Sequence, residues 1–205
     1  MTILLLIRHG EVEGIIPPRF RGRANLLLTE RGIRQAELTR DAISDRWVLN
    51  AIYCSPLTRC VRTADTIAGP FKLDVMPHHG LNDIDYGTWQ GKLVTEVAQR
   101  WPHELTAWHS APHTMRLPGG ESLQEVFARA TDALQTILHA NHHGTVALVT
   151  HDSVIRLLLC HALGLSPASY WLTAPSPCGI SEIHFHEDRF TIRSINETQH
   201  LNESE

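Results

Sequence analysis

Short apolar runs without polar interruption recur along the chain, and such runs are typical of strands buried on both faces of a sheet. The first, Ile3–Ile7, is β-branched at both ends, and the clearest one after it is Thr145–Thr150. Two runs near the C-terminus flank Glu187-Asp188 and predict a closing hairpin. The expected strands are Ile3–Ile7, Ala51–Cys54, Leu73–Met76, Thr145–Thr150, Ile180–Phe185 and Arg189–Ile195.

Between these runs the apolar positions recur at helical spacing. Thr29 is suited to the N-cap of one helix, and Ser55-Pro56 offers a capping hydroxyl followed by proline at the first helical position. Ser122 and Glu125 fit a capping box in front of another helix. The expected helices are Glu30–Ser44, Pro56–Ala68, a short one near Leu93–Arg100, one from Leu123 that ends before Gly144, and Ser153–Leu163.

Strands that alternate with helices predict the α/β class, with a mostly parallel central sheet covered on both faces as a three-layer αβα sandwich. The chain of 205 residues suffices for one such domain. We expect this domain to span residues 1–195, with about 69–120 forming an insertion over the sheet and the active site. Residues 196–205 are a polar tail that we expect to be loosely ordered.

The overall composition disfavours several classes of protein. Lys and Arg number 18 against 22 Asp and Glu, and the net charge of −4 disfavours a broad nucleic-acid footprint. No apolar run approaches roughly 18 residues, so neither a transmembrane helix nor a membrane partner is expected. The apolar start lacks the basic segment of an export signal, and the four cysteines have no CxxC spacing. These features favour a reduced, cytoplasmic setting.

Polar residues suited to phosphate chemistry follow three of the predicted strands. In an open α/β sheet, ligands bind at the carboxyl ends of the strands, so these residues are expected to meet at one edge. Arginine offers forked donors to phosphate oxygens, and neutral imidazole can attack phosphorus. The helix near Pro56 would add backbone N–H groups and its positive dipole end. The three segments are Arg8-His9-Gly10-Glu11, Ser55-Pro56-Leu57-Thr58-Arg59 and His151-Asp152.

The first segment resembles the RHG signature of the histidine phosphatase superfamily, in its phosphoglycerate mutase-like branch. RHG alone is a weak signal, but further motifs follow in the family's order over nearly the whole chain, which makes the resemblance specific. They are Leu28-Thr29-Glu30-Arg31-Gly32, Ser55-Pro56-Leu57-Thr58-Arg59, Gly87-Thr88-Trp89-Gln90-Gly91, Pro118-Gly119-Gly120-Glu121-Ser122 and Val149-Thr150-His151.

The resemblance implies a phosphoglycerate mutase-like fold and a metal-independent phosphomonoesterase that needs no cofactor and acts on a small phosphorylated metabolite. His9 matches the nucleophile that becomes phosphohistidine. Arg8, Arg59 and His151 match the pocket that binds the phosphate and stabilises its oxygens in the transition state. In this family the cationic side chains do the work that Mg²⁺ does elsewhere.

A carboxylic acid is also needed, first to protonate the leaving oxygen and then to activate water. The family usually has Glu where this chain has Asp83, whose side chain is one methylene shorter. Asp152 stands where this branch commonly has Gly, and is similar to the proton donor of the acid phosphatase branch. Asp83 is therefore the first candidate and Asp152 the second, while Glu11 and Asp85 remain open.

Contacts to the rest of the substrate are less constrained by the motifs. Arg19, Arg21 and Arg23 alternate around Gly22, either as a solvated loop or as a clamp in which Arg21 reaches a second anionic group. The expected substrate-binding set is Arg8, Arg21, Gly22, Arg59, His151 and Asp152.

Other functions stay open beside the phosphatase. Mutase-type phosphoryl transfer would need more cover over the site than about Lys92–Leu117 provides, and a noncatalytic phosphate-binding protein is compatible with the unusual acid position. Histidines are dense at His78-His79, His142-His143 and around His184, but no Cys or carboxylate set stands at a ligand spacing, so no metal is expected. A homodimer is only the commonest default.

Overall fold

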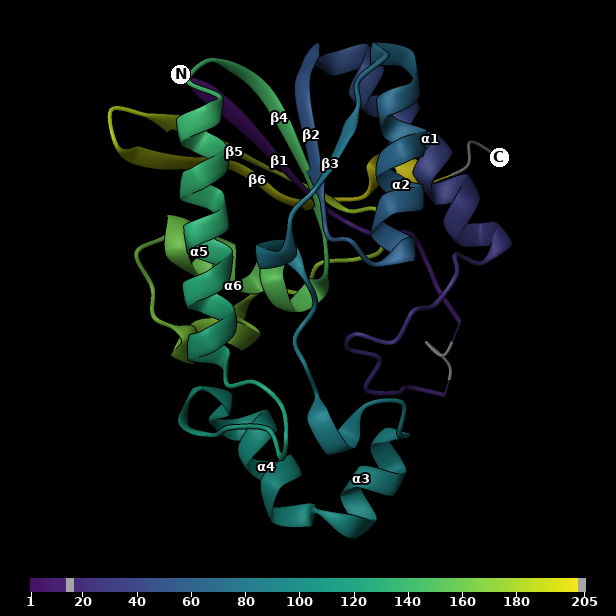
Figure 1. Cartoon of the computed structure of the whole chain (residues 1–205), viewed down its shortest axis with the longest axis vertical. Helices are drawn as coiled ribbons and strands as arrows, with labels where there is room; N and C mark the ends of the chain where they lie inside the picture. The colour runs from purple at the N-terminus through teal and green to yellow at the C-terminus, as the bar shows by residue number, and fades with distance from the viewer. Residues whose placement is uncertain (14–16, 203–205) are drawn as a thin grey trace.

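The computed structural model describes residues 1–13 and 17–202 and has a six-stranded sheet at its centre (Figure 1). The strands are β1 (Thr2–Arg8), β2 (Leu49–Cys54), β3 (Val75–Pro77), β4 (Gly144–Thr150), β5 (Ile180–His186) and β6 (Arg189–Glu197). Their order in the sheet is β3-β2-β4-β1-β5-β6; the first four run parallel, and β5 pairs antiparallel with both of its neighbours. The predicted mostly parallel sheet is confirmed.

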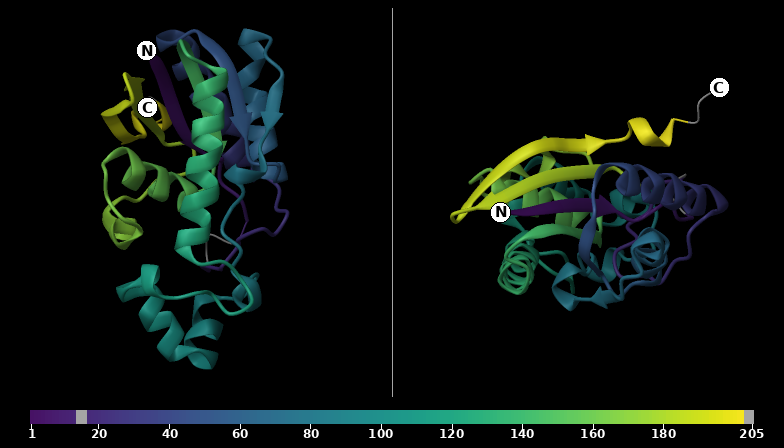
Figure 2. Two further views of the ribbon diagram at one scale, coloured as in Figure 1. Left: turned by 60° about the vertical axis from the view of Figure 1, so that its left-hand side comes forward. Right: turned by 90° about the horizontal axis from the view of Figure 1, so that it is seen from above.

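Helices cover both faces of this sheet. One face carries α1 (Glu30–Arg46) and α2 (Thr58–Ala68), and the other carries α5 (Leu123–Ala140) and α6 (Asp152–Ala162), as the view from above in Figure 2 shows. The three-layer sandwich is thus confirmed. Two shorter helices, α3 (Val94–Arg100) and α4 (Pro102–Ser110), lie beyond the sheet. Short 3₁₀ segments span Gly69–Phe71, His79–Leu81, Gly87–Trp89, Pro112–Thr114, Pro167–Leu172 and Gln199–Leu201.

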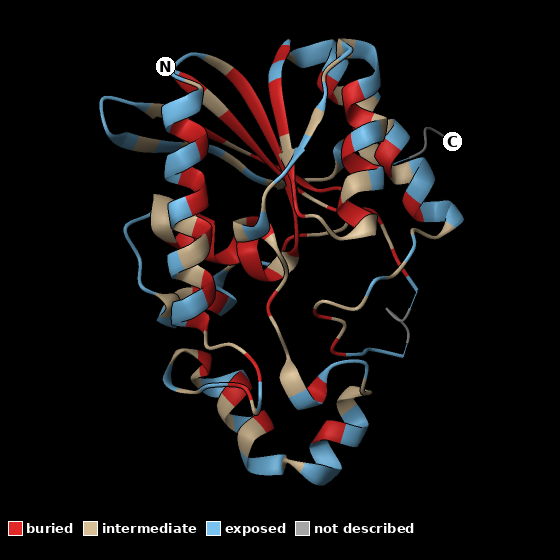
Figure 3. Cartoon of the chain, in the orientation of Figure 1, coloured by how far each residue is buried: buried red, intermediate tan, exposed pale blue. Residues whose placement is uncertain are grey.

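The central strand β1 shows how the chain builds two cores from one apolar run. Because successive side chains of a strand point to opposite faces, Leu4 and Leu6 join the core under α5 and α6, while Leu5 and Ile7 join the core under α1 and α2. All four are at most 1% exposed. Burial of each such side chain stabilises the fold by roughly 1.5–3 kcal/mol. Figure 3 shows the buried strands between helices whose outer faces are exposed.

Two of the predicted elements near the site differ in the structure. The helix expected from Pro56 begins at Thr58, because the Ser55 hydroxyl accepts from the Leu57 backbone N–H and holds Pro56 in a turn before the helix. The N–H groups of Leu57 and Thr58 bond Ser55 Oγ and Asn25 Oδ1. The expected contribution of these two groups to a phosphate site is therefore wrong.

The segment after β2 also differs from its prediction. β3 begins at Val75 and ends on Pro77, which an edge strand tolerates because its outer N–H groups have no partner strand. It is part of the sheet, although it falls within the stretch expected to be an insertion. The remainder of that stretch extends past the carboxyl ends of the strands and contains α4, a helix missing from the prediction (Figure 1). Only Leu105 and Trp108 give α4 a buried face, which is too short a pattern to read from sequence.

The C-terminus is more ordered than expected. β6 continues past Asn196 to Glu197, and the 3₁₀ turn that follows brings His200 Nε2 within 3.0 Å of Thr39 Oγ1 on α1. The ion pair of Glu197 with Arg46, at 2.6 Å, ties the same segment to the end of α1. The expectation of loose order is therefore wrong from Asn196 to Leu201. Residues 203–205, like residues 14–16, lie outside the described residues.

Close backbone packing fixes the loop that leaves β1. The Thr29 side chain caps α1 through Gly32 N, as predicted, and its backbone N–H donates to Glu11 O. Gly32 presses against the same loop: a Cβ at this position would lie 2.1 Å from Glu11 O. On the other side, Gly10 N donates to Thr63 Oγ1 of α2. The residues that follow β1 are therefore held between two helices.

We expect Gly32→Ala to lower the free energy of unfolding by about 1–3 kcal/mol, because the added methyl forces the first turn of α1 away from the Glu11 backbone. Denaturant titration measures the change. Gly69→Ala is the matched control, since its Cβ would meet no atom within 4 Å and its φ is negative. Equal stabilities for the two variants would contradict the proposed contact.

Candidate active site

The carboxyl ends of β1, β2 and β4 bring the predicted residues together, with Arg59 as the bridge. Arg59 Nε donates to His9 Nε2 at 3.1 Å, and Arg59 Nη2 lies 3.1 Å from His151 Nδ1. The two imidazole rings meet edge to face with their centres 5.2 Å apart. Backbone carbonyls hold the guanidinium in this place, because Nη1 donates to Ala24 O and Nη2 to Gly22 O.

His9 is held as a neutral ring with one defined free nitrogen. Its Nδ1 lies 2.7 Å from Gly10 O, and a carbonyl oxygen can only accept, so the ring proton sits on Nδ1. The lone pair is therefore on Nε2, which faces Arg59. Burial, together with the nearby His151, Arg59 and Arg8, holds the pKa of His9 well below its ordinary value. This is the form of imidazole that can act as a nucleophile.

His151 is fixed from behind by a serine. Its Nε2 lies 2.8 Å from Ser55 Oγ, and the Ser55 hydroxyl donates to Asn82 Oδ1 at 3.1 Å. Since a hydroxyl has one proton, Ser55 must accept from His151, so Nε2 carries the ring proton and Nδ1 faces Arg59. Burial, followed by the charges of Arg59 and Arg8, holds the pKa of His151 well below its ordinary value.

A cavity of about 270 Å³ opens onto this cluster. It is smaller than the roughly 300–1,000 Å³ of most drug-sized ligand pockets. Arg59 and His151, each 1% exposed, lie behind the wall of the cavity and do not line it. The residues from the sequence prediction that do line it are Arg8, His9, Arg21, Gly22, Asp83 and Asp152.

Asp83 separates Arg59 and His151 from this cavity. Its Oδ2 accepts from Arg59 Nη2 at 3.0 Å and lies 3.5 Å from His151 Nδ1. Its Oδ1 accepts from the Ser153 hydroxyl at 2.6 Å and from Ile84 N at 2.9 Å. The Asp83 carboxylate therefore contacts α2 through Arg59 and α6 through Ser153.

The other acidic candidates have different surroundings. Asp152 lines the cavity at the first residue of α6 and pairs with Arg156 at 2.9 Å. Glu11 accepts from the Thr29 hydroxyl and pairs with Arg31. Asp85 accepts from Gly87 N. Of the four carboxylates, only Asp83 contacts both Arg59 and His151 in the described part of the chain.

The chain matches the family model of the histidine phosphatase superfamily, branch 1, over residues 4–198. Phosphoserine phosphatase 1 of Hydrogenobacter thermophilus is 36% identical over 203 residues, which cover 99% of this chain and 96% of that protein. The chain belongs to the histidine phosphatase superfamily. The fold class, the family and the enzyme class predicted from the sequence, a phosphatase, are confirmed.

Solved structures of this superfamily share the whole fold. YhfR of Bacillus stearothermophilus superposes with a TM-score of 0.94 at 27% identity, covering 98% of this chain and all of that one. A mutant phosphoserine phosphatase of Entamoeba histolytica, solved in complex with phosphoserine, has a TM-score of 0.87 at 28% identity with the same coverage. The architecture described above is therefore that of histidine phosphatases along the full chain.

Arg8, at the end of β1, and Arg21, in the loop that follows, line the cavity of this histidine phosphatase. Arg8 Nη1 donates to Pro175 O, while its buried Nε bonds no group among the described residues. Arg21 also lines the cavity, and burial with the nearby Arg8 lowers the pKa of its guanidinium. Gly22, at φ +47°, turns the loop so that its carbonyl meets Arg59.

Some contacts of the site lie outside the sequence prediction. Ser55 and Ser153 stand beside predicted residues in the motifs, and that adjacency is the signal that points to them. Arg129 is different, because it lies in the middle of α5 with no local pattern around it. Its guanidinium donates to the carbonyls of Asn82 and Asp83 and thereby holds the loop that carries Asp83. The same guanidinium pairs with Glu121.

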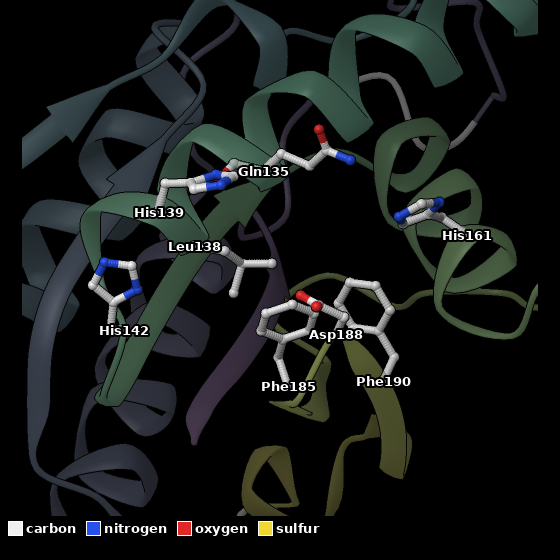
Figure 4. Close-up of a pocket in the computed structure, with 8 residues that line it drawn as sticks. All are labelled: Gln135, Leu138, His139, His142, His161, Phe185, Asp188 and Phe190. Carbon is white, nitrogen blue, oxygen red and sulfur yellow. The ribbon is translucent and has the colours of Figure 1, made fainter.

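A larger cavity, of about 480 Å³, lies at the opposite end of the sheet between α5, α6 and the β5–β6 hairpin. Figure 4 shows its lining, which includes His139, His142 and His161 around Phe185 and Phe190. None of the residues in the predicted site lines it.

No group of three or more His, Cys, Asp or Glu within residues 1–13 and 17–202 is arranged to hold a metal ion. No helix in those same ranges has the length and apolarity to cross a membrane.

The buried neutral histidines make stability depend on pH. Because the pKa values of His9 and His151 are lower in the folded state than the ordinary value, the unfolded chain binds more protons below about pH 6.5, and stability falls as pH falls. We expect a loss of up to about 1.4 kcal/mol per pH unit for each of the two groups. Denaturant titrations at pH 5, 6 and 7 measure this slope.

His9→Asn should make that slope shallower, since the variant has one fewer group that gains a proton on unfolding. His103→Asn is the control, because His103 is exposed on α4. A slope that is the same in the wild type and in His9→Asn would contradict the neutral state assigned to His9.

Proposed function

We propose that the protein hydrolyses a small phosphomonoester in two steps through a phosphohistidine on His9, without a metal ion. The observation that carries this proposal is the hydrogen bond from His9 Nδ1 to Gly10 O, which leaves the Nε2 lone pair beside the guanidinium of Arg59. A nucleophile with a fixed tautomer next to cationic donors is what phosphoryl transfer requires.

In the first step, His9 Nε2 attacks phosphorus as the bond to the ester oxygen breaks. Arg59 Nε gives up its contact with His9 and, together with Arg8, donates to the equatorial oxygens, while His151 Nδ1 accepts from Arg59 Nη2 and keeps the guanidinium in place. The buried Nε of Arg8 supports this role, because it is a donor without a partner among the described residues. Asp83, protonated at Oδ2, gives its proton to the leaving oxygen, so that a neutral alcohol departs.

In the second step, water takes the place of the alcohol. Asp83 is now a carboxylate and accepts a proton from the water as the water oxygen attacks phosphorus. The P–N bond breaks, inorganic phosphate leaves, and His9 regains its lone pair while Asp83 regains its proton. One carboxyl group therefore serves both steps. It must lie near the phosphoryl group, where it can reach the leaving oxygen in the first step and the attacking water in the second.

Charge compensation supports a reaction that is independent of metals. The phosphoryl group would meet Arg8, Arg19 and Arg21, which line the cavity, and it would reach Arg59 behind the wall once Asp83 releases the guanidinium. Several fixed positive charges can neutralise the developing negative charge, as Mg²⁺ does in other phosphoryl-transfer sites.

The size of the cavity and the names of the relatives favour a small substrate. A volume of about 270 Å³ suits a compact metabolite. The wall offers positive charge at Arg21 and negative charge at Asp152, and such a pair would complement a substrate with carboxylate and ammonium groups. Phosphoserine, named in the relatives, is the first substrate to assay.

We expect hydrolysis of p-nitrophenyl phosphate between pH 5 and 8 to persist in EDTA and to fall at least about 1,000-fold in His9→Ala, because the nucleophile is lost. Mass spectrometry of rapidly quenched wild-type enzyme should find the phosphoryl group on His9. Activity retained in His9→Ala would overturn the assignment. Phosphate binding without turnover in the wild type would support a noncatalytic phosphate-binding protein instead.

The proton donor is tested by changing the leaving group. In Asp83→Asn, kcat/KM for phosphoserine should fall about 100- to 1,000-fold, while p-nitrophenyl phosphate, whose leaving group needs little protonation, should lose less than about 10-fold. Asp152→Asn is the matched control, since Asp152 lines the same cavity. A leaving-group dependence in Asp152→Asn that is absent from Asp83→Asn would transfer the role to Asp152.

A further inference from the structure

Ser153 lies beside the carboxylate assigned to proton transfer, yet it has no part in the reaction as described so far. It is the second residue of α6, is 2% exposed, and lines the cavity. Its hydroxyl donates to Asp83 Oδ1 at 2.6 Å. It also accepts, at 3.4 Å, from the backbone N–H of Ile84, the residue after Asp83. Ser153 therefore contacts both the side chain and the backbone of the acid-bearing loop.

These contacts make the two oxygens of Asp83 unequal. Oδ1 accepts from the Ser153 hydroxyl and from Ile84 N, so both of its lone-pair directions are used. Oδ2 accepts only from Arg59 Nη2 among the described residues. When Arg59 turns to a phosphoryl group, Oδ2 is the oxygen whose lone pair becomes free, and a proton on Asp83 is then held at Oδ2.

We propose that Ser153 is a positioning residue for the reaction: it fixes the Asp83 carboxyl so that Oδ2 faces the ester oxygen and delivers the proton. This inference rests on the proposed function, in which Asp83 is the acid. The leaving oxygen receives that proton as its bond to phosphorus breaks, and Ser153 itself keeps its own proton throughout.

The short side chain of aspartate makes such positioning necessary. Asp83 has one rotatable bond fewer than a glutamate, so the position of its carboxyl depends more directly on the loop that carries it. Ser153 joins that loop to α6, whose N-cap is His151. Arg129 holds the loop backbone from the other side. The acid and His151 are thereby fixed to the same helix end, and a misplacement of about 1 Å in such a constellation can cost about 100-fold in rate.

The test is a series of phosphomonoesters with increasingly basic leaving groups, from aryl phosphates to the alkyl phosphate phosphoserine, assayed for kcat/KM. In Ser153→Ala we expect little change for p-nitrophenyl phosphate and a loss of about 10-fold or more for phosphoserine, so that the dependence on leaving-group basicity steepens. Ser153→Thr, which keeps the hydroxyl, should restore the wild-type dependence. A purely structural loss would lower all substrates by the same factor.

Ser181→Ala is the matched control, because Ser181 is also a buried serine, whose hydroxyl accepts from the Asn196 backbone N–H away from the cavity. It should leave the leaving-group dependence unchanged. Asp83→Asn, measured in the same series, separates the two proposals. If Asp83→Asn steepens the dependence and Ser153→Ala does not, the role of Ser153 is wrong. If neither steepens it, the assignment of Asp83 fails first.

Discussion

The site depends on one buried guanidinium. Arg59 contacts His9, His151 and Asp83, which come from three different parts of the chain, and it is 1% exposed. A buried cation of this kind is stable only when its donors are satisfied, and the carbonyls of Gly22 and Ala24 complete the set. The first loop, the start of α2 and the acid-bearing loop must therefore all be in place before the two histidines can face each other.

The parallel sheet supplies this convergence. β1 and β4 are neighbours and end in register at Arg8 and Thr150, so His9 and His151 leave the sheet side by side. α2 follows β2, on the other side of β4, and brings Arg59 between the rings. Tight packing of Gly10 and Gly32 then limits where the loop after His9 can lie. The strand order thus determines which residues meet at the site, and the packing of Gly10 and Gly32 fixes the loop beside them.

The fold class and the meeting of Arg8, His9, Arg59 and His151 could be predicted, because apolar runs identify strands and ligand-binding residues gather at the carboxyl ends of parallel strands. The start of α2 could not, since the Ser55 hydroxyl that accepts from Leu57 N also contacts the distant residues His151 and Asn82, which the local sequence does not reveal. α4 and the ordered stretch after Asn196 were missed for a related reason. Both depend on contacts with distant segments, such as Thr39 with His200, which leave no periodic pattern in the local sequence.

The hydrogen-bond count at Arg59 has a further consequence. Nη2 carries two hydrogens but lies within 3.1 Å of three acceptors, namely Gly22 O, Asp83 Oδ2 and His151 Nδ1. Two hydrogens cannot form full hydrogen bonds to three acceptors, so in the resting arrangement at least one of these acceptors has only a shared or weak hydrogen bond. An incoming phosphoryl oxygen that replaces Asp83 breaks a shared contact instead of a full charged hydrogen bond. The resting arrangement is thereby made less stable than a saturated one, and the barrier to exchanging one anion for another is lower.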